Sequence, residues 1–136
     1  MKAFRLALAA LALGVAATAP AQAQTVKIGL INTYSGPMAS NGDQIQKSID
    51  LFQKMNASKL PAGVKVEIIK RDDTGINPET AKRLAQELIV REKVNMITGV
   101  VWTPNAAAIA PLTKEAKVPF IIMNAGTAMI TTLSPY

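Results

Sequence analysis

The sequence predicts an α/β protein with a doubly wound parallel sheet and helices on both faces. Short apolar segments rich in β-branched residues alternate with amphipathic segments of roughly 10–15 residues, which is the order found in βαβ units. The apolar segments carry few polar positions, as expected of strands that are covered on both faces. Right-handed crossovers between such strands produce a parallel sheet.

The first half of the chain supplies two strands and a helix. Residues 26–31 (VKIGLI) form a short apolar run and are expected to be a buried strand. A helix is expected from Gln44 onward, where apolar side chains recur at helical spacing: Ile45, Ile49, Phe52 and Met55. A Pro/Gly turn at 60–63 ends this helical region, and the alternation in 64–70 predicts the second strand.

The second half repeats the same alternation. Asn77-Pro78-Glu79 is typical of a helix start, with a capping side chain, proline at the first helical position and an acid in the first turn. This helix is expected to continue through Ile89. The remaining expected elements are a strand at 94–101, a helix at 103–116, a strand at 118–123 and a helix beginning near Ala128.

The first 23 residues have the pattern of a cleaved signal peptide. Lys2 and Arg5 precede an apolar run at 6–17, and Ala21-Gln22-Ala23 is a small-x-small cleavage site. The alternative is a membrane anchor, which needs about 20 apolar residues. The run here is shorter and polar residues follow it, so we expect export to the periplasm and a mature chain of residues 24–136 that fits within one domain.

Composition argues against several classes of function. The 15 basic and 9 acidic residues are scattered, and no basic run is interleaved with aromatic residues, so nucleic-acid binding is not expected. The chain has no histidine and no cysteine, which removes the usual general base, the thiol nucleophile and disulfide bonds. Phosphate-binding glycine motifs are missing too. We therefore expect no enzyme, no cofactor and no metal site.

A small-molecule site is expected at the carboxyl ends of the strands, where open α/β sheets bind their ligands. The segments predicted at this edge are 32–42, 72–77, 102–105 and 124–127. The first, third and fourth are rich in small, hydroxyl and amide residues and lead into helices, whose N-termini favour carboxylates. Hydroxyl donors are available at Ser35, Thr103 and Thr127. Each loop taken singly is also explained by turn and helix-capping chemistry.

Two further features at this edge have alternative interpretations. Trp102, the sole tryptophan, either packs at the rim of the sheet or forms one wall of a pocket, and Tyr34 has the same two interpretations. The Asp72-Asp73 pair either caps a turn and pairs with a neighbour, which we favour, or holds a metal or a phosphoryl group.

The chain resembles the branched-chain amino-acid-binding family of periplasmic binding proteins, the solute receptors of ABC importers. The resemblance rests on S-G-P…G-D, D-D-T…N-P and A-G-T, which occur in this order and are spread over the mature chain. It implies a two-lobed protein that closes on an amino acid or related small carboxylate and delivers it to a membrane permease. It further implies that residues 24–136 form part of the N-terminal lobe, so that this chain alone has half a cleft and does not bind solute tightly.

The resemblance also implies the residues that touch the solute. The loop after the third strand contributes contacts to the ligand carboxylate, and the loop after the fourth contributes a backbone contact and a hydroxyl. The expected contacts are Ser35, Asn41, Trp102, Thr103, Asn105, Ala125 and Thr127. Leucine-type members carry an aromatic residue at the position of Asn41 and a smaller one at that of Trp102, which leaves room here for a larger or aromatic acid.

Two other classes of function were weighed. A ligand sensor of the same fold would report the solute to a signalling partner instead of a permease. A phosphotransfer domain that uses Asp72 or Asp73 would be an enzyme, but export away from phosphate donors argues against it, and no nucleophile–base pair can be named.

Overall fold

The computed structural model describes residues 24–133; residues 1–23, the expected signal peptide, and residues 134–136 lie outside the described part. A four-stranded parallel sheet runs through the centre in the order β2-β1-β3-β4. Its strands are β1 (Gln24–Asn32), β2 (Val64–Asp72), β3 (Met96–Gly99) and β4 (Phe120–Ile122). The predicted α/β class and the order of the elements are confirmed.

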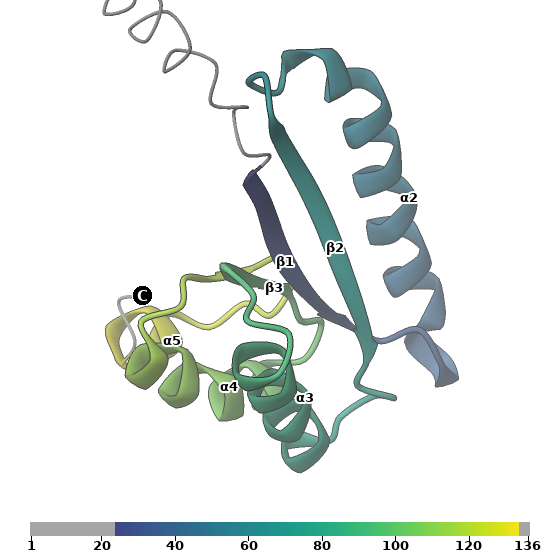
Figure 1. Ribbon diagram of the computed structural model, residues 1–136. Helices are drawn as coiled ribbons and strands as arrows, with labels where there is room; N and C mark the ends of the chain where they lie inside the picture. The colour runs from purple at the N-terminus through teal and green to yellow at the C-terminus, as the bar shows by residue number, and fades with distance from the viewer. Residues whose placement is uncertain (1–23, 134–136) are drawn as a thin grey trace, which may run out of the picture.

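Helices cover both faces of this sheet (Figure 1). They are α2 (Ala39–Asn56), α3 (Pro78–Val90), α4 (Thr103–Ala116) and α5 (Ala128–Leu133), with 3₁₀ turns at Gly36–Met38 and Ala57–Lys59. The chain moves from β1 outward to β2, then back past β1 to β3 and on to β4. Because each crossover is right-handed, this reversal places α2 on one face and α3 and α4 on the other. The switch point lies between β1 and β3.

The boundaries of some elements differ from those predicted. Helix α2 begins at Ala39, earlier than the expected Gln44, because the 3₁₀ turn that starts at Gly36 leads directly into it. Strand β3 ends at Gly99, two residues before its predicted end. Gly99 and Val100 both have positive φ, at 104° and 64°, and this conformation cannot continue a strand. A Cβ at position 99 would also lie 3.0 Å from the Leu30 side chain.

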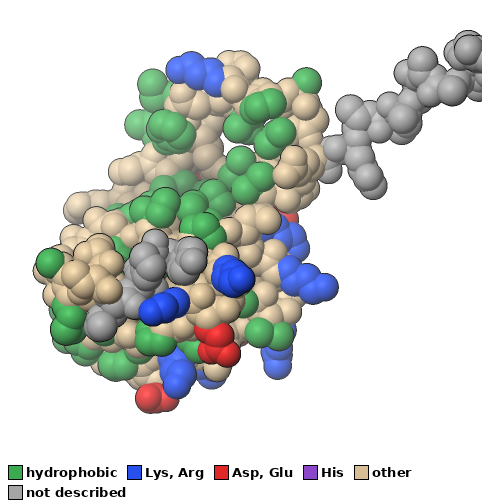
Figure 2. Space-filling view, turned by 90° about the vertical axis from the view of Figure 1, so that its left-hand side faces the viewer, with side chains coloured by type: hydrophobic (Ala, Val, Ile, Leu, Met, Phe, Trp, Pro, Cys, Tyr) green, Lys and Arg blue, Asp and Glu red, His purple; other side chains and the backbone are tan. Residues whose placement is uncertain are grey.

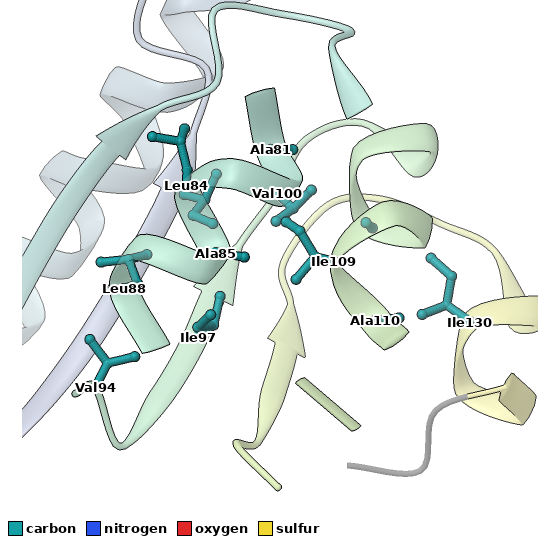
Figure 3. Packing of buried hydrophobic residues seen from close by; sticks show 12 residues of the cluster. Ala81, Leu84, Ala85, Leu88, Val94, Ile97, Val100, Ile109, Ala110 and Ile130 are labelled. Carbon is teal, nitrogen blue, oxygen red and sulfur yellow. The ribbon is translucent and has the colours of Figure 1, made fainter. Parts of the chain in front are cut away.

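The hydrophobic core lies between the sheet and the α3–α4 layer (Figure 3). Leu88 of α3, Ile97 of β3 and Ile109 of α4 are fully buried there. Burying each such side chain stabilises the fold by about 1.5–3 kcal/mol. Helix α3 approaches β1 closely at Gly29, where a Cβ would lie 2.8 Å from Leu88 Cδ1.

The opposite face of the sheet is less fully covered. An apolar groove of about 560 Å³ separates α2 from the strands, and residues such as Ile28, Phe52 and Val66 line it. Phe52 and Met55 of α2 are 68% and 69% exposed. Figure 2 shows hydrophobic side chains gathered around a hollow on the surface. In the described residues, α2 is therefore held mainly at its two ends.

Candidate solute-binding site

The loops that follow the strands meet at one edge of the sheet, and backbone hydrogen bonds join them. Asp73 N–H donates to Asn32 O (3.0 Å), which links the loop after β2 to the end of β1. Val100 N–H donates to Ile31 O (2.8 Å), and Ala125 N–H donates to Val100 O (3.1 Å). This edge contains the switch point at which doubly wound sheets bind ligands.

The first loop is closed by the start of α2. Gly42 lies directly against the carbonyl group of Thr33, and a Cβ at this position would overlap that group. Glycine is therefore required for the close approach of the helix to the loop. The side chain of Tyr34 lies in the same region, and its hydroxyl donates to Gln46 Oε1 of α2 at 3.2 Å. Burial raises the pKa of Tyr34 to about 12, so it stays neutral and can donate this hydrogen bond.

Asp72 holds the first two loops together. Its Oδ1 accepts hydrogen bonds from the backbone N–H of Tyr34 and of Thr74, both at 2.9 Å. Burial alone would raise the pKa of Asp72, but these donors, together with the amide and hydroxyl of Ser35, lower it below its ordinary value. The preferred structural interpretation of this carboxylate is therefore confirmed.

Asp73 is the centre of a buried hydrogen-bond network. Thr33 Oγ1 donates to Asp73 Oδ1 at 2.7 Å, and the indole N–H of Trp102 donates to Thr33 Oγ1 at 3.0 Å. Gly75 N–H also donates to Asp73 Oδ1 (3.2 Å). Thr33 and Asp73 are 1% and 0% exposed, whereas Trp102 is partly exposed. The network thus begins inside the protein and ends at an aromatic ring that reaches the surface.

Asn105, one of the predicted contacts, belongs to this network. The residue is fully buried, and its Nδ2 donates to Asp73 Oδ2 and to Gly75 O, both at 2.8 Å. Its Oδ1 accepts from Asn77 N–H at 2.9 Å. Both polar atoms of the amide therefore hold the loop after β2 against α4.

The other predicted site residues lie at the same edge and are all partly exposed. They are Ser35, Asn41, Trp102, Thr103, Ala125 and Thr127. Trp102, not Thr103, occupies the N-cap position of α4, and its side chain makes no capping hydrogen bond. Thr103 is the first helical residue and Pro104 the second. The N-cap side chain therefore caps none of the N–H groups of this first turn, and Pro104 carries no N–H.

Sequence reasoning missed Thr33 and Asn32. Thr33 follows a buried strand directly, and its hydroxyl was not recognised as the link between Asp73 and Trp102. The amide of Asn32 is fully buried at the end of β1, beside the hydroxyl of Tyr34. A polar residue at the end of an apolar strand that reaches the switch point was the available signal for both.

The fold and this edge define an α/β lobe of the kind that binds a small solute at the carboxyl ends of parallel strands. None of the helices in residues 24–133 combines the length and the apolar character needed to cross a membrane. The family model described as periplasmic binding protein matches residues 25–135, and the chain belongs to that family.

Curated relatives agree with this family. The Leu/Ile/Val-binding protein homolog 6 from Brucella abortus (strain 2308) is 39% identical over 132 residues, a match that covers 97% of this chain and 34% of the relative. The chain therefore spans about a third of the length of the curated relatives it matches.

Solved structures of ABC-transporter solute-binding proteins match the fold. The protein from R. palustris in complex with 4-hydroxybenzoate is 47% identical, with a TM-score of 0.78 and coverage of 83% of this chain and 30% of that one. The protein from Rhodopseudomonas palustris BisB5 in complex with 3,4-dihydroxybenzoic acid is 52% identical, with a TM-score of 0.76 and coverage of 82% and 30%. LivJ from Streptococcus pneumoniae in complex with isoleucine is 26% identical, with a TM-score of 0.74 and coverage of 83% and 32%.

Proposed function

We propose that the chain forms part of the first lobe of a periplasmic receptor that captures a small aromatic carboxylate for an ABC importer. The observation that carries this proposal is the partly exposed indole of Trp102 at the N-terminus of α4. An aromatic surface and the backbone N–H of Thr103, at a helix start that the Trp102 side chain does not cap, then lie next to each other. A benzoate ring and its carboxylate are matched to these two features.

The expected contacts divide into two groups. Trp102 supplies the surface for the ring, while the backbone N–H and the hydroxyl of Thr103 donate hydrogen bonds to the carboxylate. From the loop after β4, Thr127 adds a hydroxyl and Ala125, whose N–H donates to Val100 O, adds a backbone contact. Ser35 and Asn41 border the site from the first loop.

The comparisons support an aromatic solute over an aliphatic amino acid. The proteins in complex with hydroxybenzoates are 47% and 52% identical to this chain, whereas the isoleucine-bound protein is 26% identical. In this proposal, residues 1–23 are a signal peptide that directs export to the periplasm, and a membrane permease receives the solute. The chain binds and releases its ligand unchanged and is not an enzyme.

A hybrid protein tests this proposal. Residues 24–136 replace the equivalent segment of the R. palustris 4-hydroxybenzoate-binding protein, which supplies the remaining part of the cleft. Calorimetric titrations use 4-hydroxybenzoate, 3,4-dihydroxybenzoate and isoleucine, with the unmodified R. palustris protein as the control. We expect micromolar or tighter binding of the two aromatic acids and none of isoleucine. A folded hybrid that binds isoleucine, or that binds neither aromatic acid, would refute the proposal.

A further inference from the structure

We infer that Thr33 is a positioning residue. The buried carboxylate of Asp73 orients the hydroxyl of Thr33, and this hydroxyl fixes the indole ring of Trp102 as a wall of the solute site. The importance of this ring for binding rests on the proposed function. The positioning itself rests on two hydrogen bonds, Thr33 Oγ1 to Asp73 Oδ1 (2.7 Å) and Trp102 Nε1 to Thr33 Oγ1 (3.0 Å).

The chemistry of the three side chains allows one direction of hydrogen bonding. An ionised carboxylate only accepts hydrogen bonds, and an indole N–H only donates. A hydroxyl does both, so Thr33 can join them, with its proton directed at Asp73 and a lone pair directed at Trp102. Because Thr33 is 1% exposed and Asp73 is 0% exposed, water does not compete for this arrangement.

Asp73 is itself held rigidly, which makes it a firm support for the hydroxyl. Its Oδ1 also accepts from Gly75 N–H (3.2 Å), and its Oδ2 accepts from Asn105 Nδ2 (2.8 Å). Donors from the loops after β1 and β2 and from α4 thus converge on one carboxylate. The five-membered ring of the indole is fixed at Nε1 through Thr33 and at Cγ through its bond to Cβ of Trp102 at the start of α4.

The consequence concerns selectivity. Aromatic rings bind one another in offset or edge-to-face arrangements with defined separations, so a rotated wall presents a different surface to a planar solute. A ring held at these two atoms is preorganised for a single orientation, which lowers the cost of ordering it on binding. Thr33 therefore influences the affinity for an aromatic acid without touching it.

The chain contains one tryptophan, so its ¹H–¹⁵N spectrum has one indole N–H signal that reports this contact directly. Thr33→Val preserves the shape of the side chain and removes both hydrogen bonds, while Thr33→Ser keeps the hydroxyl. We expect hydrogen exchange of the indole N–H to become at least about tenfold faster in Thr33→Val. In Thr33→Ser it should stay within about threefold of the original chain, since the bridging hydroxyl remains.

Unchanged indole exchange in a folded Thr33→Val chain would overturn the inference. If that variant does not fold, indole exchange is measured in the original chain instead. An indole N–H that exchanges there as fast as free indole is not held by Thr33, and this result would also overturn the inference. The hybrid protein separates this result from the proposed function. There, Thr33→Val should weaken 4-hydroxybenzoate binding about tenfold and Thr33→Ser should not. A hybrid with native Thr33 that binds no aromatic acid refutes the proposed function and leaves the indole result standing.

Discussion

Replacing Asp73 with asparagine should strongly destabilise the protein, although the two side chains have nearly the same shape. The carboxylate accepts from Thr33 Oγ1, from Gly75 N–H and from Asn105 Nδ2. An asparagine amide offers one oxygen and one donating nitrogen. If the nitrogen takes the place of Oδ2, it faces the donating Nδ2 of Asn105. If it takes the place of Oδ1, Gly75 N–H loses its acceptor. Either orientation leaves a buried donor without a partner.

The magnitude follows from these contacts. A buried donor without a partner costs about 1–3 kcal/mol, and hydrogen bonds to a charged group contribute about 1.5–3 kcal/mol each. We expect Asp73→Asn to lower the free energy of unfolding by about 2–4 kcal/mol. Urea denaturation followed by the fluorescence of Trp102 measures this change.

Asp72→Asn is the matched control, because Asp72 is adjacent in sequence but only partly buried. Its hydrogen-bond donors are mainly backbone N–H groups, and the amide oxygen of an asparagine can still accept from them. It should cost about 1 kcal/mol. If Asp73→Asn lowers the free energy of unfolding by no more than Asp72→Asn does, the idea that a buried carboxylate organises this edge is refuted.

Further predictions concern backbone, charge and surface. Thr74 is exposed with φ at 60°, a conformation that asparagine tolerates better than a β-branched residue, so Thr74→Asn should raise the free energy of unfolding by about 0.5–1 kcal/mol in urea titrations. Gly42→Ala should lower the melting temperature, with a loss of about 1–3 kcal/mol, because the new Cβ overlaps the Thr33 carbonyl. The pKa of Asp72 is lowered in the folded state, so the ionised carboxylate contributes to the free energy of unfolding at neutral pH, and this contribution is lost as the pH falls below the ordinary aspartate range. The difference in free energy of unfolding between the original chain and Asp72→Asn should therefore shrink between pH 7 and pH 3. Phe52→Ser should reduce binding of the dye ANS, because this 68% exposed ring lines the apolar groove; unchanged dye fluorescence would contradict that assignment.

The periodicity of apolar residues was sufficient to predict every strand and every longer helix of the described chain, because local pattern and tertiary burial agree. The ends of β3 were not predictable in the same way. Val100 is a strand-forming residue by type, but its N–H bonds to Ile31 O and its φ is 64°, so the tertiary contact overrides the local preference.

The sequence indicated where the site would lie but not which way its side chains point. Parallel strands place their carboxyl ends at one edge, so the loops could be assigned without coordinates. Asn105 shows the limit of this reasoning. It lies in the expected segment, but the direction of its side chain depends on the position of Asp73, which is distant in sequence. Thr33 was missed for the same reason, since its role exists only when Asp73 and Trp102 are both in place.

The two neighbouring aspartates bear on the proposed preference of this edge for an aromatic carboxylate. Asp72 ends β2 and closes the first loop, while Asp73, directly after the strand, ties that loop to α4. Each carboxylate already accepts hydrogen bonds from three residues. A solute ammonium group needs anionic or carbonyl acceptors, and within the described residues neither aspartate is available to serve as one. The partly exposed groups predicted at this edge are the hydroxyls of Ser35, Thr103 and Thr127, the amide of Asn41 and the indole of Trp102. This arrangement offers hydroxyl and amide donors for an acid while both aspartates are already engaged, which supports the proposed aromatic carboxylate over a zwitterion.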